Sequence, residues 1–445
     1  MSELSDLPVV VIGAGPAGLA AAAHLRSRNV DFVVLESGPA AGAAVREWGH
    51  VRLFSAWSEL VDPAADKILA NAGWTPPDPK RYPTGTAWVE SYLQPLADAL
   101  GDAVRYDATV TAVTKQSRDR LVNSGRDDAP FTVHVDTPGG AEHITARAVI
   151  DASGTWGGPN PLGGDGVPAI GEADAVGQIS YRIPDLNAAG DRARYAGKHV
   201  VVAGTGASAK GALIGLTTLA KHEPGTRVSW LVRRSNVGEA FAGSGQDELP
   251  ERGALGQQAQ AAVEAGPVST LNGFRTASVR RQDDGRLTIE SFDGQSVTDV
   301  DEVIVLTGFR PDLDMLSEIR LDLDPVLQAP RELAPLIDPN EHSCGTVYPH
   351  GAKELAQPEQ GFYLVGMKSY GRATSFLALT GFEQTRSVVA AIAGDLEAAA
   401  RVELTLPDTG VCGGAGLFDD ETAEGGGCCA APAGPELIQL GGSTA

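Results

Sequence analysis

Two stretches of the chain share one pattern of apolar and polar positions. In residues 7–36 the β-branched run VVVI is followed by GAGPAG, by an Ala-rich segment and by a second apolar run, DFVVLE. Continuous apolar runs of this length are typical of parallel strands buried on both faces. Residues 198–234 repeat the order with KHVVVAGTGASAKGALIGLTTLAKH and RVSWLVRR. The pattern predicts two strand–turn–helix–strand units, roughly 190 residues apart.

The remaining segments predict more strands and two helices. Residues 37–83 show little periodicity, whereas residues 84–100 have the spacing of one amphipathic helix. Strands are expected within residues 103–116, 131–137 and 143–154, and later within 276–284, 286–294 and 301–311. Residues 159–174 are rich in loop-forming residues, and the chain returns to the first unit through residues 361–371 and a final helix in 375–394. We therefore predict an α/β fold with two Rossmann-like dinucleotide-binding domains, the second inserted in the first.

The first glycine-rich turn has the residues that dinucleotide binding needs. Gly13 makes the tight turn, Gly15 lets a pyrophosphate approach the backbone, and Gly18 lets the helix pack on the strand. The helix beginning near Pro16 presents free N–H groups and the positive end of its dipole to an anion. Glu36 ends the second strand, where a carboxylate accepts hydrogen bonds from ribose hydroxyls. Together these features predict a dinucleotide site.

The second turn differs at the end of its second strand. It contains Gly204 and Gly206, with Ala209 in the third glycine position, and its second strand ends in Arg233 and Arg234 instead of an acid. A guanidinium pair suits a 2′-phosphate, which favours NADP over NAD. The alternative is that both arginines form a solvated strand end. An acid in the first unit and arginines in the second predict FAD in the first and NADPH in the second.

These assignments divide the chain into four parts. We expect an FAD-binding domain built from residues 1–160 and 305–402, with an NADP-binding domain in residues 161–304. Beyond Glu403 the sequence is rich in Gly, Ala and Pro, which predicts a flexible tail over residues 403–445. Three of the four cysteines, Cys412, Cys428 and Cys429, lie in this tail. Thiolates bind soft metalloids, and the alternative is that the tail and its cysteines are incidental.

Charge and composition narrow the expected partners. The chain has 35 Lys and Arg against 57 Asp and Glu, a net charge of −22, which disfavours nucleic acid and anionic membrane surfaces. The N-terminal segment is not basic, and the apolar stretch 9–25 contains three glycines and a proline, so neither a signal peptide nor a membrane span is expected. The few cysteines fit a reducing cytoplasm. His342, Cys344 and His350 lack the tight spacing of a zinc site, and no metal is expected.

Several further motifs resemble a known family of flavoproteins in their order along the chain. The segments 151–154, 306–311 and 361–367 resemble the two domain crossings and the flavin-approaching strand of class B flavin-containing monooxygenases and thioredoxin-reductase-like proteins. A finer resemblance, carried by segments 48–55, 82–85, 159–161, 343–350 and 367–372, is to flavin monooxygenase-like proteins associated with bacterial arsenic-resistance genes. Residues 175–184 lack the monooxygenase signature histidine. Residues 161–304 contain no cysteine, which disfavours disulfide reduction.

The two turns and the resemblance together nominate a set of cofactor-binding residues. These are Gly13, Gly15, Pro16, Ala17, Gly18, Glu36, Ser37, Val110, Ser153, Gly154, Gly204, Gly206, Ala207, Ser208, Arg233, Arg234, Gly308, Gly366 and Met367.

The resemblance implies an NADPH-dependent, FAD-containing monooxygenase. Oxygen would pass from a flavin C4a-hydroperoxide to a soft nucleophile such as sulfur, nitrogen or trivalent arsenic. The cofactor supplies this chemistry, so no catalytic side chain is assigned. His50 and Arg52 are candidates for lining the site, and the alternative is that they are hydrogen-bonded loop residues.

Two rival functions remain open at this point. One is a flavin reductase or oxidase that does not stabilise the peroxide, and the other is a metalloid-binding flavoprotein. The expected partners are a small-molecule substrate and O₂. The oligomeric state is open, a homodimer included.

Overall fold

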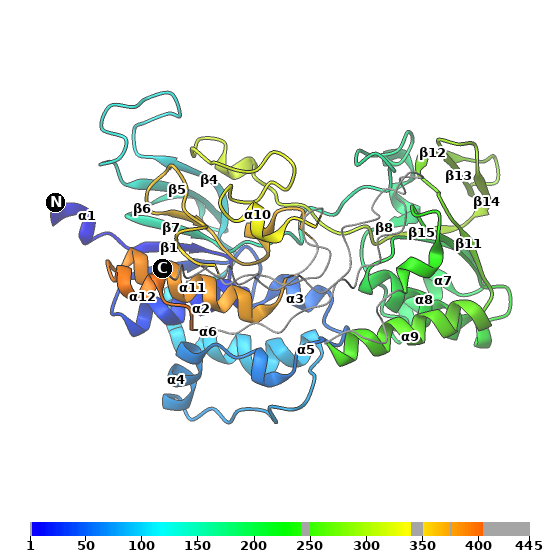
Figure 1. Cartoon of the computed structure of the whole chain (residues 1–445), viewed down its shortest axis with the longest axis horizontal. Coiled ribbons are helices and arrows are strands. Elements are labelled where there is room, and N and C mark those ends of the chain that lie inside the picture. The colour runs from blue at the N-terminus through cyan, green and yellow to red at the C-terminus, as the bar shows by residue number, and fades with distance from the viewer. Residues whose placement is uncertain (1, 242–248, 340–349, 374–375, 404–445) are drawn as a thin grey trace, which may run out of the picture.

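The computed structural model describes residues 2–241, 249–339, 350–373 and 376–403. The chain forms two lobes, one built from its N-terminal and C-terminal parts and the other from its middle (Figure 1). Among these residues no helix is both long and apolar enough to cross a membrane. Each lobe contains one parallel sheet, one small antiparallel sheet and covering helices, which confirms the predicted fold class.

The first parallel sheet combines strands that are far apart in sequence. Its order is β16-β7-β1-β2-β3, and all its pairs are parallel. The central strand is completely buried, as its unbroken apolar run predicts. The strand from the C-terminal part adds to the edge beside β7, so the chain does return to its first unit. The strands are β1 (Val9–Ile12), β2 (Phe32–Leu35), β3 (Val104–Arg105), β7 (Ala148–Asp151) and β16 (Phe362–Leu364).

The second parallel sheet lies entirely between the two parts of the first in the chain order. Its strand order is β11-β10-β9-β15-β8, again with parallel pairs throughout. Its central strand is also buried along its length. The strands are β8 (Ile179–Ser180), β9 (His199–Ala203), β10 (Arg227–Leu231), β11 (Val268–Leu271) and β15 (Glu302–Val305).

Each lobe also has a three-stranded antiparallel sheet. The first contains β4 (Thr109–Lys115), β5 (Phe131–Thr137) and β6 (Gly140–Ala146), and the second β12 (Thr276–Arg281), β13 (Leu287–Ser291) and β14 (Ser296–Val300). Residues 143–154, expected as one strand, form two strands in different sheets, β6 and β7. The backbone leaves the antiparallel sheet at Arg147, between the two strands, and enters the parallel one.

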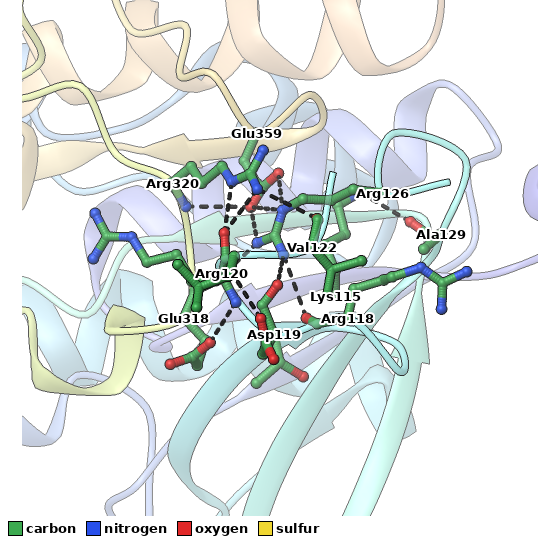
Figure 2. Close-up of polar contacts among 12 residues, drawn as sticks. Lys115, Arg118, Asp119, Arg120, Val122, Arg126, Ala129, Glu318, Arg320 and Glu359 are labelled. Atoms are coloured by element: carbon green, nitrogen blue, oxygen red, sulfur yellow. Dashed lines mark hydrogen bonds and ion pairs between the residues drawn. The ribbon is translucent and has the colours of Figure 1, made fainter. Parts of the chain in front are cut away.

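A buried ion pair holds the long β4–β5 connection against the body (Figure 2). Arg126 and Glu359 are 1% and 2% exposed, and the Arg126 Nε donates to Glu359 Oε1 over 2.9 Å. The same guanidinium donates to the carbonyls of Asp119 and Glu318. Because every buried polar atom of this pair has a partner, the cluster is a structural anchor rather than a reactive site.

Helices cover one face of each parallel sheet, and the antiparallel sheet of the same lobe covers the other face. In the first lobe α2 packs against α11 and α4, and in the second α8 packs against α9. The helices of the first lobe are α1 (Ser2–Ser5), α2 (Pro16–Ser27), α3 (Ala43–Glu47), α4 (Pro63–Asn71), α5 (Gly85–Trp88), α6 (Gln94–Leu100), α10 (Ala334–Ile337), α11 (Ala378–Ile392) and α12 (Leu396–Ala400). Those of the second are α7 (Ala189–Tyr195), α8 (Ala207–His222) and α9 (Pro250–Ala265).

The amphipathic helix expected over residues 84–100 is interrupted. A π-helical segment, Val89–Leu93, separates α5 from α6. Pro95 has no N–H and cannot bond the carbonyl of Ser91 four residues before it. That carbonyl instead accepts a hydrogen bond from Trp74 Nε1 over 2.8 Å. The proline thus frees a carbonyl that ties the preceding loop to the helix.

Candidate functional site

The first glycine-rich turn is shaped to receive an anion. Gly13 has a φ of +96°, and a Cβ there would lie 2.9 Å from Ala152 O. A Cβ on Gly18 would overlap Gly13 O, so only glycine lets α2 sit this close to the turn. A Cβ on Gly15 would meet no atom within 4 Å, which leaves open space where a pyrophosphate is expected. No side chain of the described residues caps the start of α2, so its first N–H groups are available there.

Glu36 is fixed in place at the end of β2. It is 7% exposed, and its Oε2 accepts from Ala14 N over 2.7 Å while Oε1 accepts from Gly38 N over 2.8 Å. Ser37 lies beside it, with Oγ 3.5 Å from Oε1. Oε2, which has Ala14 N as its one donor among the described residues, keeps a second lone pair for a ribose hydroxyl. Val110 lies near this acid on β4, two residues after Ala108, whose N–H donates to Glu36 O.

A buried ion pair lies where the chain leaves the first sheet. Asp151, the last residue of β7, and Lys368 are 0% and 1% exposed, and Lys368 Nζ lies 2.7 Å from Asp151 Oδ2. Both groups also bond Ser153: Asp151 Oδ1 accepts from its Oγ over 2.7 Å, and Lys368 donates to the same Oγ over 3.0 Å. Ser153 itself is exposed and precedes Gly154, whose φ is +71°. The pair therefore fixes the first crossing at the edge of the site.

Gln384 on α11 organises the end of β16. Its Oε1 accepts from Gly366 N over 2.8 Å, and its Nε2 donates to Ser369 Oγ and lies 2.9 Å from His350 Nε2. A Cβ on Gly366, whose φ is +66°, would lie 2.9 Å from the Ala17 side chain. The expected residues of the first turn, of Ser153–Gly154 and of Gly366–Met367 thus gather at the carboxyl ends of β1, β7 and β16. This is where open α/β sheets bind ligands.

The second glycine-rich turn repeats this geometry and is less crowded only at its third position. Gly204 has a φ of +119°, and a Cβ there would overlap the carbonyl oxygen of Leu306, the first residue of the second crossing. A Cβ on Gly206 would meet nothing within 4 Å. Ala207 begins α8 without a side-chain cap, and Gly206 and Ser208 are exposed. The third glycine position holds Ala209, which is fully buried and tolerated.

Three arginines gather near the ends of β10 and β11. Arg233 is exposed and Arg234 is half-buried, and Arg234 O accepts from Gly273 N over 2.8 Å. Although the residue is exposed as a whole, partial desolvation of its guanidinium by neighbouring groups, followed by the positive charges of Arg275 and Arg234, lowers the pKa of Arg233. Sequence reasoning missed Arg275, although its place four residues after the end of the neighbouring strand was a usable signal. The cluster concentrates positive charge near the ends of β10 and β11, and its role toward a 2′-phosphate stays a prediction.

Two antiparallel segments connect the lobes. Asn160 N donates to Gly308 O over 2.9 Å, and Arg310 N donates to Gly158 O over 2.8 Å. Gly308 has a φ of +95° and is exposed. Asn160 Oδ1 also accepts from Arg310 Nε over 2.8 Å. Gly308, the residue expected at this crossing, therefore lies in a pair of hydrogen-bonded antiparallel segments that connect the two lobes.

The two candidates for lining the substrate site lie on the loop after α3. His50 is exposed, and Arg52 is exposed with its Nη1 donating to Tyr82 O over 2.8 Å. Their role in lining the site stays a prediction. Cys412, Cys428 and Cys429 lie outside the described residues. Within the part of the chain that the structure describes, no three His, Cys, Asp or Glu side chains gather as metal ligands.

The comparisons with known proteins agree with this geometry. A model of the pyridine nucleotide-disulphide oxidoreductase family matches residues 10–344, about three quarters of the chain. Among curated proteins, an opine oxidase chain of Agrobacterium tumefaciens is 30% identical over 191 residues, and a thiamine thiazole synthase of Methanococcus maripaludis is 39% identical over 71. These matches cover 42% and 16% of this chain. They span 32% and 26% of those proteins, less than a third of either.

Solved structures share the fold over most of the chain. Bacillithiol disulfide reductase Bdr from Bacillus cereus aligns with a TM-score of 0.63 at 20% identity, over 87% of this chain and 99% of its own. The flavin-containing monooxygenase of Stenotrophomonas maltophilia aligns at 0.52 and 23%, over 88% and 99%. The ornithine N-hydroxylase of Kutzneria sp. 744 aligns at 0.55 and 19%, over 88% and 99%. At these identities the likeness shows the fold alone.

Proposed function

The chain belongs to the pyridine nucleotide-disulphide oxidoreductase family, and we propose that it is an NADPH-dependent, FAD-containing monooxygenase that oxygenates a soft nucleophile. FAD and NADP are its cofactors, and the two turns fit them. Gly15 and Gly206 leave open space beside uncapped helix starts, which is what each pyrophosphate needs. Glu36 suits the FAD ribose, and the three arginines suit a 2′-phosphate.

The chain's own residues bind and orient the cofactors. Bound FAD would take a hydride from NADPH and pass electrons to O₂, which is chemistry that the cofactor supplies. Lys368 and Asp151 hold Ser153 at the edge of the first site, and Gln384 holds the Gly366 backbone. Because these side chains are buried and mutually bonded, they present a fixed wall to the cofactor and keep bulk water from that side.

The position of the cysteines carries the choice of monooxygenase over disulfide reductase. The four cysteines of the sequence are Cys344, Cys412, Cys428 and Cys429, and none lies within residues 161–304. A dithiol reductase of this architecture needs a redox-active cysteine pair beside the flavin. Without such a pair in that domain, O₂ is the electron acceptor that the proposal assigns. Sulfur, nitrogen and trivalent arsenic are the proposed nucleophiles, arsenic through the family resemblance of segments 48–55 and 343–350.

Isotope labelling tests the proposal. Purified protein would be mixed with NADPH, ¹⁸O₂ and, in turn, a thioether, a tertiary amine and a trivalent arsenical. The balanced reaction consumes NADPH, a proton, O₂ and substrate, and yields NADP⁺, water and a product with one ¹⁸O. We expect labelled product from at least one substrate, in proportion to the NADPH consumed. NADPH oxidation that ends in hydrogen peroxide alone would make the protein an oxidase and contradict the proposal.

A further inference from the structure

A cation–aromatic cluster joins the two lobes beside the paired crossing segments. The Arg182 guanidinium lies 4.0 Å from the centre of the Trp156 ring and 5.9 Å from that of Phe309. The two rings are themselves 5.0 Å apart at 31°. Trp156 follows the first crossing, Phe309 lies in the second, and Arg182 follows β8 in the second lobe. The cluster therefore touches both connections and the domain that they carry.

Glu47 ties this cluster to the first lobe. It is the last residue of α3, and its Oε2 accepts from Trp156 Nε1 over 2.8 Å and lies 3.4 Å from Arg182 Nε. This ion pair joins the second lobe to the first. A single carboxylate oxygen thus receives one donor from the crossing and one from the inserted domain.

The contacts can be removed without unfolding either domain. The Arg182 and Glu47 side chains are 36% and 55% exposed, so neither core depends on them. The planar guanidinium can stack on Trp156 and pair with Glu47 at the same time, which a lysine ammonium cannot do. Among the described residues, the buried Nη1 atom of Arg182 has no hydrogen-bond partner.

We propose that Arg182, clasped by Trp156 and Glu47, is a positioning residue that sets the orientation of the NADP-binding domain relative to the FAD-binding domain. Two backbone segments alone form a hinge with rotational freedom, because few backbone dihedrals define their direction. The ion pair of Arg182 with Glu47 on α3 adds a contact outside the crossing segments and restricts this freedom. Hydride transfer needs donor and acceptor atoms within about 3–3.5 Å, so a small change of orientation slows it strongly. The kinetic consequence rests on the proposed function, whereas the orientation does not.

A distance measurement without any nucleotide tests the orientation directly. Spin labels would be placed at Lys67→Cys on α4 and Gln257→Cys on α9, both exposed, with the four native cysteines replaced by serine. Double electron–electron resonance should give a narrow distribution for the otherwise unchanged chain, and a broadened or shifted one for Arg182→Ala and Glu47→Gln. Arg281→Ala is the matched control, because Arg281 donates to Gly285 O and Asp174 O in its own lobe. An unchanged distribution in Arg182→Ala would overturn the proposal.

Anaerobic stopped-flow reduction gives the second readout. Arg182→Ala should slow flavin reduction by NADPH roughly tenfold or more at saturation and leave the Kd for NADPH unchanged, because the nucleotide-binding turn is intact. The rate of flavin reduction in Arg182→Lys should lie between those of the unaltered protein and Arg182→Ala. The double variant Arg182→Ala with Glu47→Gln should be no slower than Arg182→Ala alone. A changed Kd with an unchanged rate would make Arg182 a nucleotide ligand and contradict the positioning role. Failure of NADPH to reduce the unaltered protein would refute the proposed function and leave the distance result standing.

Discussion

The two glycine-rich turns share one backbone geometry, but the residues at the end of the second strand carry opposite charge in the two units. Both place a glycine of positive φ after a buried strand and leave open space beside an uncapped helix. In the first unit Glu36 is buried and already holds two backbone N–H groups, and Gly18 lets the helix touch the turn. In the second unit the strand end carries arginines, one of them exposed, and Ala209 replaces the third glycine. The first is built as a tight, fixed site and the second as an open one, as expected for a resident FAD and an exchanging NADPH.

Substitution at the third position of the motif should have the largest effect, and a different effect in each unit. In Gly18→Ala the new Cβ would overlap Gly13 O, so α2 must move away from the turn, at a cost of about 3 kcal/mol or more. We expect protein that is purified without flavin or is insoluble, measured as the FAD absorbance per chain. The matched change in the second unit, Ala209→Gly, should cost only about 0.5–1 kcal/mol and keep full flavin content. Equal tolerance of both changes would show that the two turns are packed alike.

The two domain crossings should differ almost as much in the free energy of unfolding that a substitution costs. Lys368→Met leaves the Asp151 carboxylate buried without its cation, which should lower the free energy of unfolding by about 3–5 kcal/mol. Urea denaturation followed by circular dichroism measures this loss.

The controls for this prediction lie at both crossings. The double variant Asp151→Asn with Lys368→Met should recover most of the loss, because no charge is then buried. At the second crossing Thr307→Val removes hydroxyl bonds to the carbonyls of Asn160 and Pro161 and should cost only about 1 kcal/mol. A Lys368→Met protein as stable as the parent would mean that the ion pair is dispensable.

The arginine cluster should decide the choice of nucleotide. Each charge-assisted bond to a 2′-phosphate contributes about 1.5–3 kcal/mol, so removing two arginines should raise the KM for NADPH roughly tenfold or more. Arg233→Ala with Arg234→Ala should therefore erase the preference for NADPH and leave NADH kinetics unchanged. Arg275→Ala should have an effect in the same direction. An equal loss with both nucleotides would show that the arginines stabilise the strand end instead.

The central strands should differ slightly in their response to acid. β9 begins with His199, which is 8% exposed and lies 2.9 Å from Ser229 Oγ, whereas the corresponding strand β1 begins with Val9. Burial lowers the pKa of His199, so the folded chain binds fewer protons there than the unfolded chain. Stability from this group is complete above about pH 6.5 and falls as the pH drops toward the lowered pKa. His199→Gln should reduce the decrease in Tm between neutral and mildly acidic buffer, and an identical decrease would remove His199 as its cause.

Local signals predicted the turns, and long-range contacts escaped prediction. The glycines, Glu36 and the arginine pair stand at fixed offsets from apolar strands, so the sequence was sufficient to place them. Lys368 and Gln384 gain their roles from partners far away in the chain, such as Asp151 for Lys368. No periodicity contains that information, because it arises only when the sheets assemble.

Some missed elements had local signals after all. α4 begins at Pro63 after Asp62, whose carboxylate accepts from Ala64 N and Ala65 N, a standard helix start. α9 also has a proline, Pro250, in its first turn. The π-helical break between α5 and α6 followed from Pro95, which a steric argument could have located.

Anaerobic titration of the purified protein tests the contrast between the two sites most directly. After gel filtration without added cofactor, the protein would be treated with NADPH and NADH in separate titrations, and the released chromophore identified by mass. We expect about one FAD per chain to be retained through the column, and NADPH to reduce the flavin at a concentration roughly tenfold or more lower than NADH does. Recovery of FMN, loss of the flavin on the column, or equal reduction by both nucleotides would contradict it.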